Sequence, residues 1–157
     1  YHTFVKNIAM DIDIRPYTDA DKLAVLSLIR LNTPLYFAES EAVDFSHYLD
    51  HEKELYFVVC IDGEVVGCGG INFEDNHQLA KISWDMVHPL YHGKNVGTKL
   101  LKYRLDITQN QFSCQKVQVR TSQQAFRFYE KNGFSLTKIT KDYWALGFDL
   151  YDMTLMK

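Results

Sequence analysis

Apolar side chains recur along this chain at two different periods, and the period changes from one segment to the next. Apolar–polar alternation and short β-prone runs predict strands over residues 11–15, 55–61, 64–73, 79–87, 116–120, 134–140 and 148–156. Apolar positions three and four apart predict helices over residues 23–31, 40–51, 96–109 and 123–131. The order β-α-α-β-β-β-α-β-α-β-β predicts an α/β fold, with a mixed sheet and helices on both of its faces.

The helix at 96–109 joins the strands at 79–87 and 116–120, so these two strands should run parallel. Its apolar face is expected to consist of Val96, Leu100, Tyr103 and Ile107. Strict alternation in the strand before it predicts one face with Ile82, Trp84 and Met86, and an opposite face with Ser83, Asp85 and Val87.

Two further segments carry unusual residues. The strand over 64–73 contains Gly67, Gly69 and Gly70, and glycine inside a strand typically marks a bulge or a close backbone approach. Residues 141–147 are expected to form a longer loop with aromatic side chains between the last two strands.

The loop before the helix at 96–109 has Gly93, Asn95 and Gly97 at alternate positions. Glycine and asparagine tolerate left-handed backbone angles, so such a loop can turn several N–H groups toward one point. The positive end of the following helix and the nearby cations indicate a phosphorylated ligand. The spacing matches neither a P-loop nor a dinucleotide fingerprint, and an ordinary strand-to-helix connection remains the alternative.

Length and composition limit the classes of protein. The 157 residues suffice for one domain, which we expect to span residues 10–157, with 1–9 as a leader or non-native extension. A net charge of −3 argues against nucleic acid or an anionic membrane as the main partner, and no apolar run approaches the ~20 residues of a membrane span.

Candidate metal and redox chemistry is weak. Three cysteines with no C-x-x-C spacing predict reduced thiols and a cytoplasmic protein. His47 and His51 share a helix face, but no third ligand is obvious nearby, so a solvated face is favoured and no metal site is predicted.

Two motifs resemble the GNAT superfamily of N-acetyltransferases. Residues 92–98, His-Gly-Lys-Asn-Val-Gly-Thr, follow Val87-His88-Pro89 and are similar to that family's acetyl-CoA loop. Residues 122–134, Ser-Gln-Gln-Ala-Phe-Arg-Phe-Tyr-Glu-Lys-Asn-Gly-Phe, resemble its second signature. This sequence departs at His92, Asn95 and Ser122, where the family usually has Gln or Arg, Gly, and Asn.

The resemblance implies a mostly antiparallel sheet of about seven strands, with a central, splayed parallel pair. It also implies direct transfer of an acetyl group from acetyl-CoA to a primary amine in a ternary complex, without a metal. The residues that it assigns to acetyl-CoA are Met86, Val87, His92, Gly93, Lys94, Asn95, Val96, Gly97, Thr98, Ser122 and Phe128.

For the catalytic groups, Tyr129 matches the family tyrosine that protonates the leaving thiolate, and a phenol is protonated at neutral pH. Asp85 lies where the family often has a carboxylate, and it is the candidate general base, acting through water. His88 and Glu39 are the reserve candidates for the base.

The acceptor stays open between a small-molecule amine and a protein amino group. By resemblance, its pocket should be lined by Tyr36, Phe37 and Trp144, and aromatic walls can hold an ammonium group or an apolar one. Pairing of the last strand could form a homodimer. The alternative functions are a non-catalytic acyl-CoA-binding or sensing module on the same fold and a structural partner protein.

Overall fold

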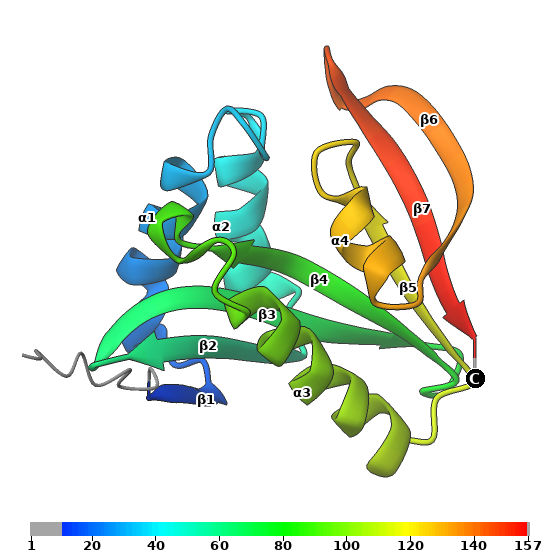
Figure 1. Ribbon diagram of the computed structural model, residues 1–157, viewed down its shortest axis with the longest axis horizontal. Helices are drawn as coiled ribbons and strands as arrows, with labels where there is room; N and C mark the ends of the chain where they lie inside the picture. The colour runs from blue at the N-terminus through cyan, green and yellow to red at the C-terminus, as the bar shows by residue number, and fades with distance from the viewer. Residues whose placement is uncertain (1–10, 157) are drawn as a thin grey trace, which may run out of the picture.

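The computed structural model describes residues 11–156, which form one seven-stranded mixed sheet and four α-helices (Figure 1). The strands are β1 (Ile12–Pro16), β2 (Leu55–Ile61), β3 (Glu64–Glu74), β4 (Leu79–Val87), β5 (Lys116–Thr121), β6 (Ser135–Ala145) and β7 (Phe148–Met156). The α-helices are α1 (Lys22–Leu31), α2 (Glu41–His51), α3 (Val96–Asn110) and α4 (Phe126–Lys131). Two short 3₁₀ turns, η1 (Asp19–Asp21) and η2 (Pro89–Tyr91), precede α1 and α3.

The strand order β1-β2-β3-β4-β5-β7-β6 contains a single parallel pair, β4 with β5. That pair is short: only Leu79–Ile82 of β4 face Lys116–Val119 of β5. Beyond this point the two strands diverge in a V (Figure 1). The prediction of a mostly antiparallel sheet with a splayed parallel pair at its centre is therefore confirmed.

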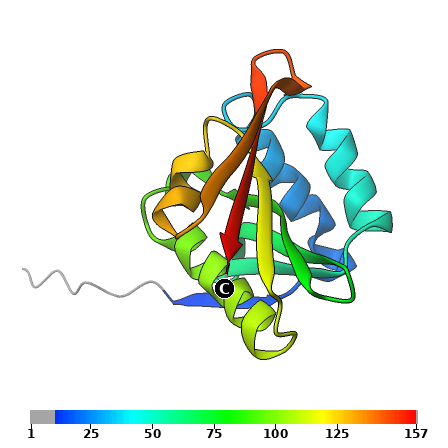
Figure 2. The same ribbon diagram turned by 90° about the vertical axis from the view of Figure 1, so that its right-hand side faces the viewer.

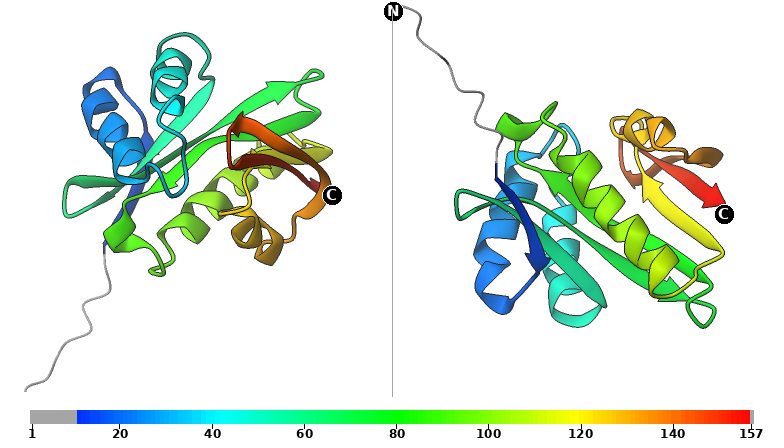
Figure 3. Two further views of the ribbon diagram at one scale, coloured as in Figure 1. Left: turned by 90° about the horizontal axis from the view of Figure 1, so that it is seen from above. Right: turned by 60° about the horizontal axis from the view of Figure 1, so that its bottom comes forward.

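Helices cover both faces of the sheet, as predicted. Figure 3 shows α1 and α2 on one face and α3 and α4 on the other. On β2, the neighbouring side chains of Val58 and Val59 are both fully buried, one in the core under α1 and α2 and the other in the core under α3 and α4. Alternation along the strand thus supplies both cores from the same segment. No helix among residues 11–156 is long and apolar enough to cross a membrane.

A β-bulge in β4 overturns the predicted alternation of that strand. Gly70 of β3 pairs with Ser83 and Cys68 pairs with Met86, so two residues of β4 oppose Gly69 alone. Trp84, within the bulge, has a left-handed φ of 50°. Because a bulge inserts one residue, the faces exchange there. Ile82 packs under α3, whereas Trp84 and Met86 pack under α1 and α2, so the predicted common face was wrong.

The end of the chain also differs from the expectation. Residues 141–145, predicted as loop, continue β6 to Ala145, and a tight turn at Gly147, φ 81°, leads into β7. Figure 2 shows this long β6–β7 hairpin standing beside β5 at the end of the sheet. Asp142 caps the turn, because its carboxylate accepts the Gly147 N–H at 2.7 Å.

The two helices beyond the splay also need correction. α4 begins at Phe126 rather than at 123. The residues before it form a turn, in which the Ser122 carbonyl accepts the N–H groups of Ala125 and Phe126. On α3, Val96 and Leu100 are buried as predicted, but Tyr103 is 37% exposed and the buried positions include Arg104 and Thr108.

The core under α3 and α4 gives a direct test of these layers. Leu101 is fully buried there, whereas Leu23 of α1 is 82% exposed. Leu101→Ala should lower the free energy of unfolding by about 2–5 kcal/mol, because it removes buried methyl groups and leaves a cavity. Leu23→Ala should change it by no more than about 0.5 kcal/mol. Urea unfolding measures both, and equal losses would contradict this packing.

Candidate active site

The divergence of β4 and β5 opens a cavity of about 730 Å³. Its walls are the second half of β4, the end of β5, the loop before α3, the start of α4 and the segment between α1 and α2. The cavity therefore lies where two parallel strands stop pairing, and the backbone edge of β4 beyond Ile82 has no strand partner on the β5 side.

The loop before α3 adopts the left-handed geometry that its composition predicted. Gly93 has φ 75° and Asn95 has φ 63°, and Asn95 is the N-cap of α3. The first N–H groups of a helix have no intrahelical partner, so those of α3 are available at this edge of the cavity. Gly97 differs, because it lies inside α3, where an added Cβ would lie 3.4 Å from the Phe128 ring.

His92 fixes the position of this loop against β4. Its Nε2 donates to the Val87 carbonyl at 2.8 Å, and its ring meets Tyr36 edge-on at 5.4 Å between centroids. Asn32 donates to the same carbonyl at 3.0 Å. The loop, the strand end and the segment after α1 are thereby joined at one atom.

Most of the predicted ligand contacts line this one cavity. They are Met86, Val87, His92, Gly93, Asn95, Val96, Gly97, Thr98, Ser122 and Phe128 for acetyl-CoA, and Tyr36, Phe37 and Trp144 for the acceptor. Lys94 does not line it, and its Nζ lies over the Tyr91 ring, 5.5 Å from the centroid.

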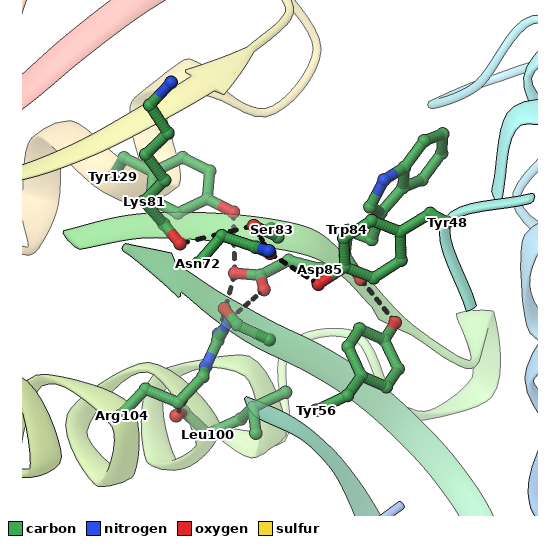
Figure 4. A network of polar contacts seen from close by, with 11 residues as sticks. Tyr48, Tyr56, Asn72, Lys81, Ser83, Trp84, Asp85, Leu100, Arg104 and Tyr129 are labelled. Atoms are coloured by element: carbon green, nitrogen blue, oxygen red, sulfur yellow. Dashed lines mark hydrogen bonds and ion pairs between the residues drawn. The ribbon is translucent and has the colours of Figure 1, made fainter. Parts of the chain in front are cut away.

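The two predicted catalytic residues are in direct contact. Tyr129 of α4 donates its hydroxyl proton to Asp85 Oδ2 of β4 at 2.8 Å, and both residues line the cavity (Figure 4). The reserve bases are not brought to them: neither Glu39 nor His88 lines the cavity, and His88 Nδ1 instead accepts the Leu90 N–H at 3.1 Å.

Arg104 of α3 binds the carboxylate of this pair. Its side chain is fully buried, and its two Nη atoms bind the two oxygens of Asp85, Nη2 to Oδ2 at 2.8 Å (Figure 4). Nη1 also donates to the Gly70 carbonyl at 3.1 Å, and Nε donates to the Leu100 carbonyl at 3.2 Å. A buried guanidinium is tolerated only when its donors are satisfied in this way.

These contacts set the protonation states. Burial lowers the pKa of the Arg104 guanidinium, but the charge and hydrogen bonds of Asp85 outweigh it, so this pKa lies above its usual value. Burial and the charge of Asp85 raise the pKa of Tyr129 well above 10, although Arg104 opposes the shift. Tyr129 is therefore a neutral phenol throughout the physiological range.

The cavity wall next to α2 consists of stacked aromatic rings and of polar side chains that are hydrogen-bonded to one another. The bulge turns Trp84 toward α2, where it stacks on Phe45 at 5.1 Å and on Phe37 at 6.2 Å between centroids. Next to it, Tyr48 and Ser83 both donate to Asn72 Oδ1, at 2.7 and 2.8 Å.

The β6–β7 hairpin contributes Trp144 to the cavity wall on the β5 side. Trp144 Nε1 donates to the Thr121 carbonyl at 3.1 Å, and the Arg120 guanidinium lies over the rings of Tyr143 and Trp144. The continuation of β6 thus brings Trp144 to the cavity.

The sequence interpretation missed Arg104, which does not line the cavity but binds the Asp85 carboxylate. The available signal was its place on α3: it follows Leu100 by four residues and precedes Thr108 by four, so a charge lies in the buried stripe. Among residues 11–156, no group of three or more His, Cys, Asp or Glu side chains is arranged to hold a metal ion.

Gly69 gives the Asp85–Arg104 pair its space. A Cβ built on Gly69 would collide with Asp85 Oδ1 and would lie 2.7 Å from Arg104 Nη1, so this glycine has the close approach that its strand position predicted. Gly69→Ala should therefore lower the free energy of unfolding by about 1–3 kcal/mol, through overpacking of a buried ion pair.

Gly67→Ala, two residues earlier in β3, is the matched control. Its Cβ would lie 3.4 Å from the nearest atoms, so it should leave stability nearly unchanged. Thermal and urea unfolding of both variants measure the difference. Equal stability of the two variants would show that the ion pair does not need the space at Gly69.

Comparison with known proteins agrees with this geometry. The model of the Acetyltransferase (GNAT) family matches residues 23–134. An N-alpha-acetyltransferase of Sulfurisphaera tokodaii is 29% identical over 151 residues, covering 87% of this chain and 86% of the relative.

Solved structures share the fold at low identity. The ribosomal-protein-S18-alanine N-acetyltransferase of Escherichia coli superposes with a TM-score of 0.76 at 17% identity, covering 92% of this chain and 93% of the other. An aminoglycoside 6′-N-acetyltransferase complexed with coenzyme A gives 0.75 at 12% identity, covering 92% and 96%. The family match extends over most of the chain, from α1 to the end of α4, and includes β4, the loop before α3 and β5. This chain therefore belongs to the GNAT family and is an acetyltransferase.

Proposed function

We propose that this acetyltransferase transfers the acetyl group of acetyl-CoA directly to a primary amine bound in the same cavity. One observation carries the proposal: the cavity at the splayed strands has the Tyr129–Asp85 pair on its wall, with the left-handed loop before α3 on one side and aromatic side chains on the other. The related N-alpha-acetyltransferase and the coenzyme A complex support the same reaction class.

Acetyl-CoA would lie between β4 and β5, with its pyrophosphate at the loop before α3. The left-handed Gly93 and Asn95 and the first amides of α3 supply N–H donors and a positive partial charge there. Gly97 and Phe128 form the adjoining wall, and Ser122 lies on the β5 side. Lys94 would have to leave the Tyr91 ring to meet a phosphate.

The chemistry requires one proton to leave the amine and one to reach the sulfur. Tyr129 is a neutral phenol on the cavity wall, so it can serve as the acid for the departing thiolate. Asp85 is the carboxylate nearest to it and the candidate base. The unpaired backbone edge of β4 offers donors to the thioester carbonyl.

The acceptor would enter from the aromatic side, between Phe37 and Trp84 on one wall and Trp144 on the other. Such walls suit the alkyl part of an amine and also its cationic form. A small-molecule amine and a protein amino group both fit this description.

Cys60, Cys68 and Cys114 are buried and form no disulfide with one another, which is consistent with the cytoplasm as the expected compartment.

Tyr129→Phe tests the proposed acid. The variant should release thiol from acetyl-CoA with kcat lower by about 10²-fold or more, because it loses a proton donor and keeps the ring. Its affinity for acetyl-CoA, measured by calorimetry, should stay within about threefold. The acceptor is the amine that gives the fastest thiol release in a panel of small amines and peptides.

Tyr103→Phe is the control, because Tyr103 lies on α3, packs against Phe57 and does not line the cavity. It should keep the wild-type kcat. Equal turnover of the two variants would remove Tyr129 from the mechanism. Tight binding of acetyl-CoA without turnover on any amine would instead favour a non-catalytic acyl-CoA-binding module.

A further inference from the structure

The hydrogen bond between Tyr129 and Asp85 fixes which way the phenol proton points. An ionised carboxylate only accepts hydrogen bonds, so the single hydroxyl proton of Tyr129 lies on the Asp85 side of the 2.8 Å contact. A phenol oxygen has further lone pairs. Because Tyr129 lines the cavity, those lone pairs are the part of the hydroxyl that it offers to a ligand.

This arrangement makes it difficult for Tyr129 to act as an acid and for Asp85 to act as a base independently of each other. For Tyr129 to protonate sulfur alone, it would have to break its bond to Asp85. For Asp85 to act alone through water, that water would have to reach a lone pair left over on its oxygens, since Arg104 already binds both oxygens and Tyr129 shares one of them. The side chain of Asp85 is also only 17% exposed.

We infer that Tyr129 and Asp85 act as one proton relay for the proposed acetyl transfer, with Arg104 as its positioning residue. Tyr129 is the member that touches the reacting atoms, first as a proton acceptor and then as a donor. Asp85 stores the proton between the two steps. The inference rests on the proposed function, because it assigns the path of the proton between the amine and the sulfur.

The proton travels from the amine to the sulfur in two steps. The nitrogen of the neutral amine forms a bond to the thioester carbon, the π electrons of the carbonyl move to its oxygen, and the nitrogen then carries one proton too many. That proton passes to the oxygen of Tyr129 while the hydroxyl proton of Tyr129 passes to Asp85 Oδ2. When the carbon–sulfur bond breaks, Tyr129 gives a proton to the sulfur and takes one back from Asp85. The nitrogen has lost one proton, the sulfur has gained one, and the relay is restored.

Arg104 makes this relay rigid and reversible. It is fully buried and lies outside the cavity lining. Both of its Nη atoms bind the Asp85 carboxylate, so the carboxylate cannot rotate away from Tyr129. Asp85 therefore stays at hydrogen-bond distance from Tyr129, so a proton that it takes up can return to the same phenol oxygen, as the second step requires.

A double-mutant cycle on kcat tests the coupling. Tyr129→Phe and Asp85→Asn should each lower kcat by about 10²-fold or more, and the double variant should be no slower than the worse single variant within about threefold. Two residues that act independently would instead give losses that multiply, and that result would overturn the relay. Acetyl-CoA affinity should stay constant across the cycle.

Asp85→Asn leaves the charge of Arg104 buried without its partner, which can prevent folding. The paired variant Asp85→Asn with Arg104→Met removes both charges together. An amide cannot store a proton, so this variant should keep the low kcat of Asp85→Asn. Recovery of kcat to within tenfold of wild type would show that Asp85 only supports the structure.

Arg104→Lys separates positioning from charge, because it keeps the positive charge but loses the bidentate contact with the Asp85 carboxylate. It should lower kcat by about tenfold or more with an unchanged KM for acetyl-CoA, and it should be faster than Arg104→Met. A raised KM with wild-type kcat would assign Arg104 to ligand binding instead and overturn its positioning role.

Solvent isotope effects on the wild-type protein test the relay without depending on the folding of any variant. In single-turnover experiments, the rate in mixtures of H₂O and D₂O should fall along a curve, because two protons move together in each step. A straight line, which one moving proton gives, would overturn the relay while leaving acetyl transfer intact. No thiol release with any amine would overturn the proposed function and the relay together.

Discussion

The buried ion pair between Asp85 and Arg104 is the interaction on which the rest of the site depends. A guanidinium and a carboxylate lose much hydration inside a protein, and their attraction compensates only when the remaining donors and acceptors are also bonded. Here the Gly70 and Leu100 carbonyls take further Arg104 donors, and Tyr129 donates to Asp85. Residues of α3, α4, β3 and β4 are thus joined by one network (Figure 4).

The local backbone is built around that pair. Gly69 lacks the Cβ that would occupy the space of the two charges, and the bulge opposite it turns Asp85 toward α3 while Trp84 turns toward α2. A regular strand would have given these two positions to the other faces. One inserted residue therefore directs the carboxylate to its arginine and the tryptophan to the acceptor side.

The sequence predicted the parts of the site that depend on local chemistry. Gly93 and Asn95 have the left-handed angles that their residue types favour, and the helix predicted over 123–131 does carry Tyr129, although it begins at Phe126. The order of strands and helices followed from periodicity, because a helix between β4 and β5 requires a parallel pair.

The rest depended on contacts between distant segments. Arg104 looks like an exception on an apolar helix face until Asp85, 19 residues earlier, is brought beneath it. The bulge at Trp84 cannot be placed by alternation, since alternation assumes that no residue is inserted. The extension of β6 to Ala145 is accompanied by two hydrogen bonds across the hairpin: the Asp142 N–H donates to Asp149 Oδ1, and the Asp142 carboxylate accepts the Gly147 N–H.

Calorimetric titration of the wild-type chain with acetyl-CoA shows whether the splay between β4 and β5 is a site for this ligand. We expect saturable binding of one molecule per chain, with a rise in the unfolding temperature that grows with ligand concentration. An absence of binding heat together with an unchanged unfolding temperature would contradict it, because the loop before α3 and the cavity would then lack the ligand around which the mechanism is built.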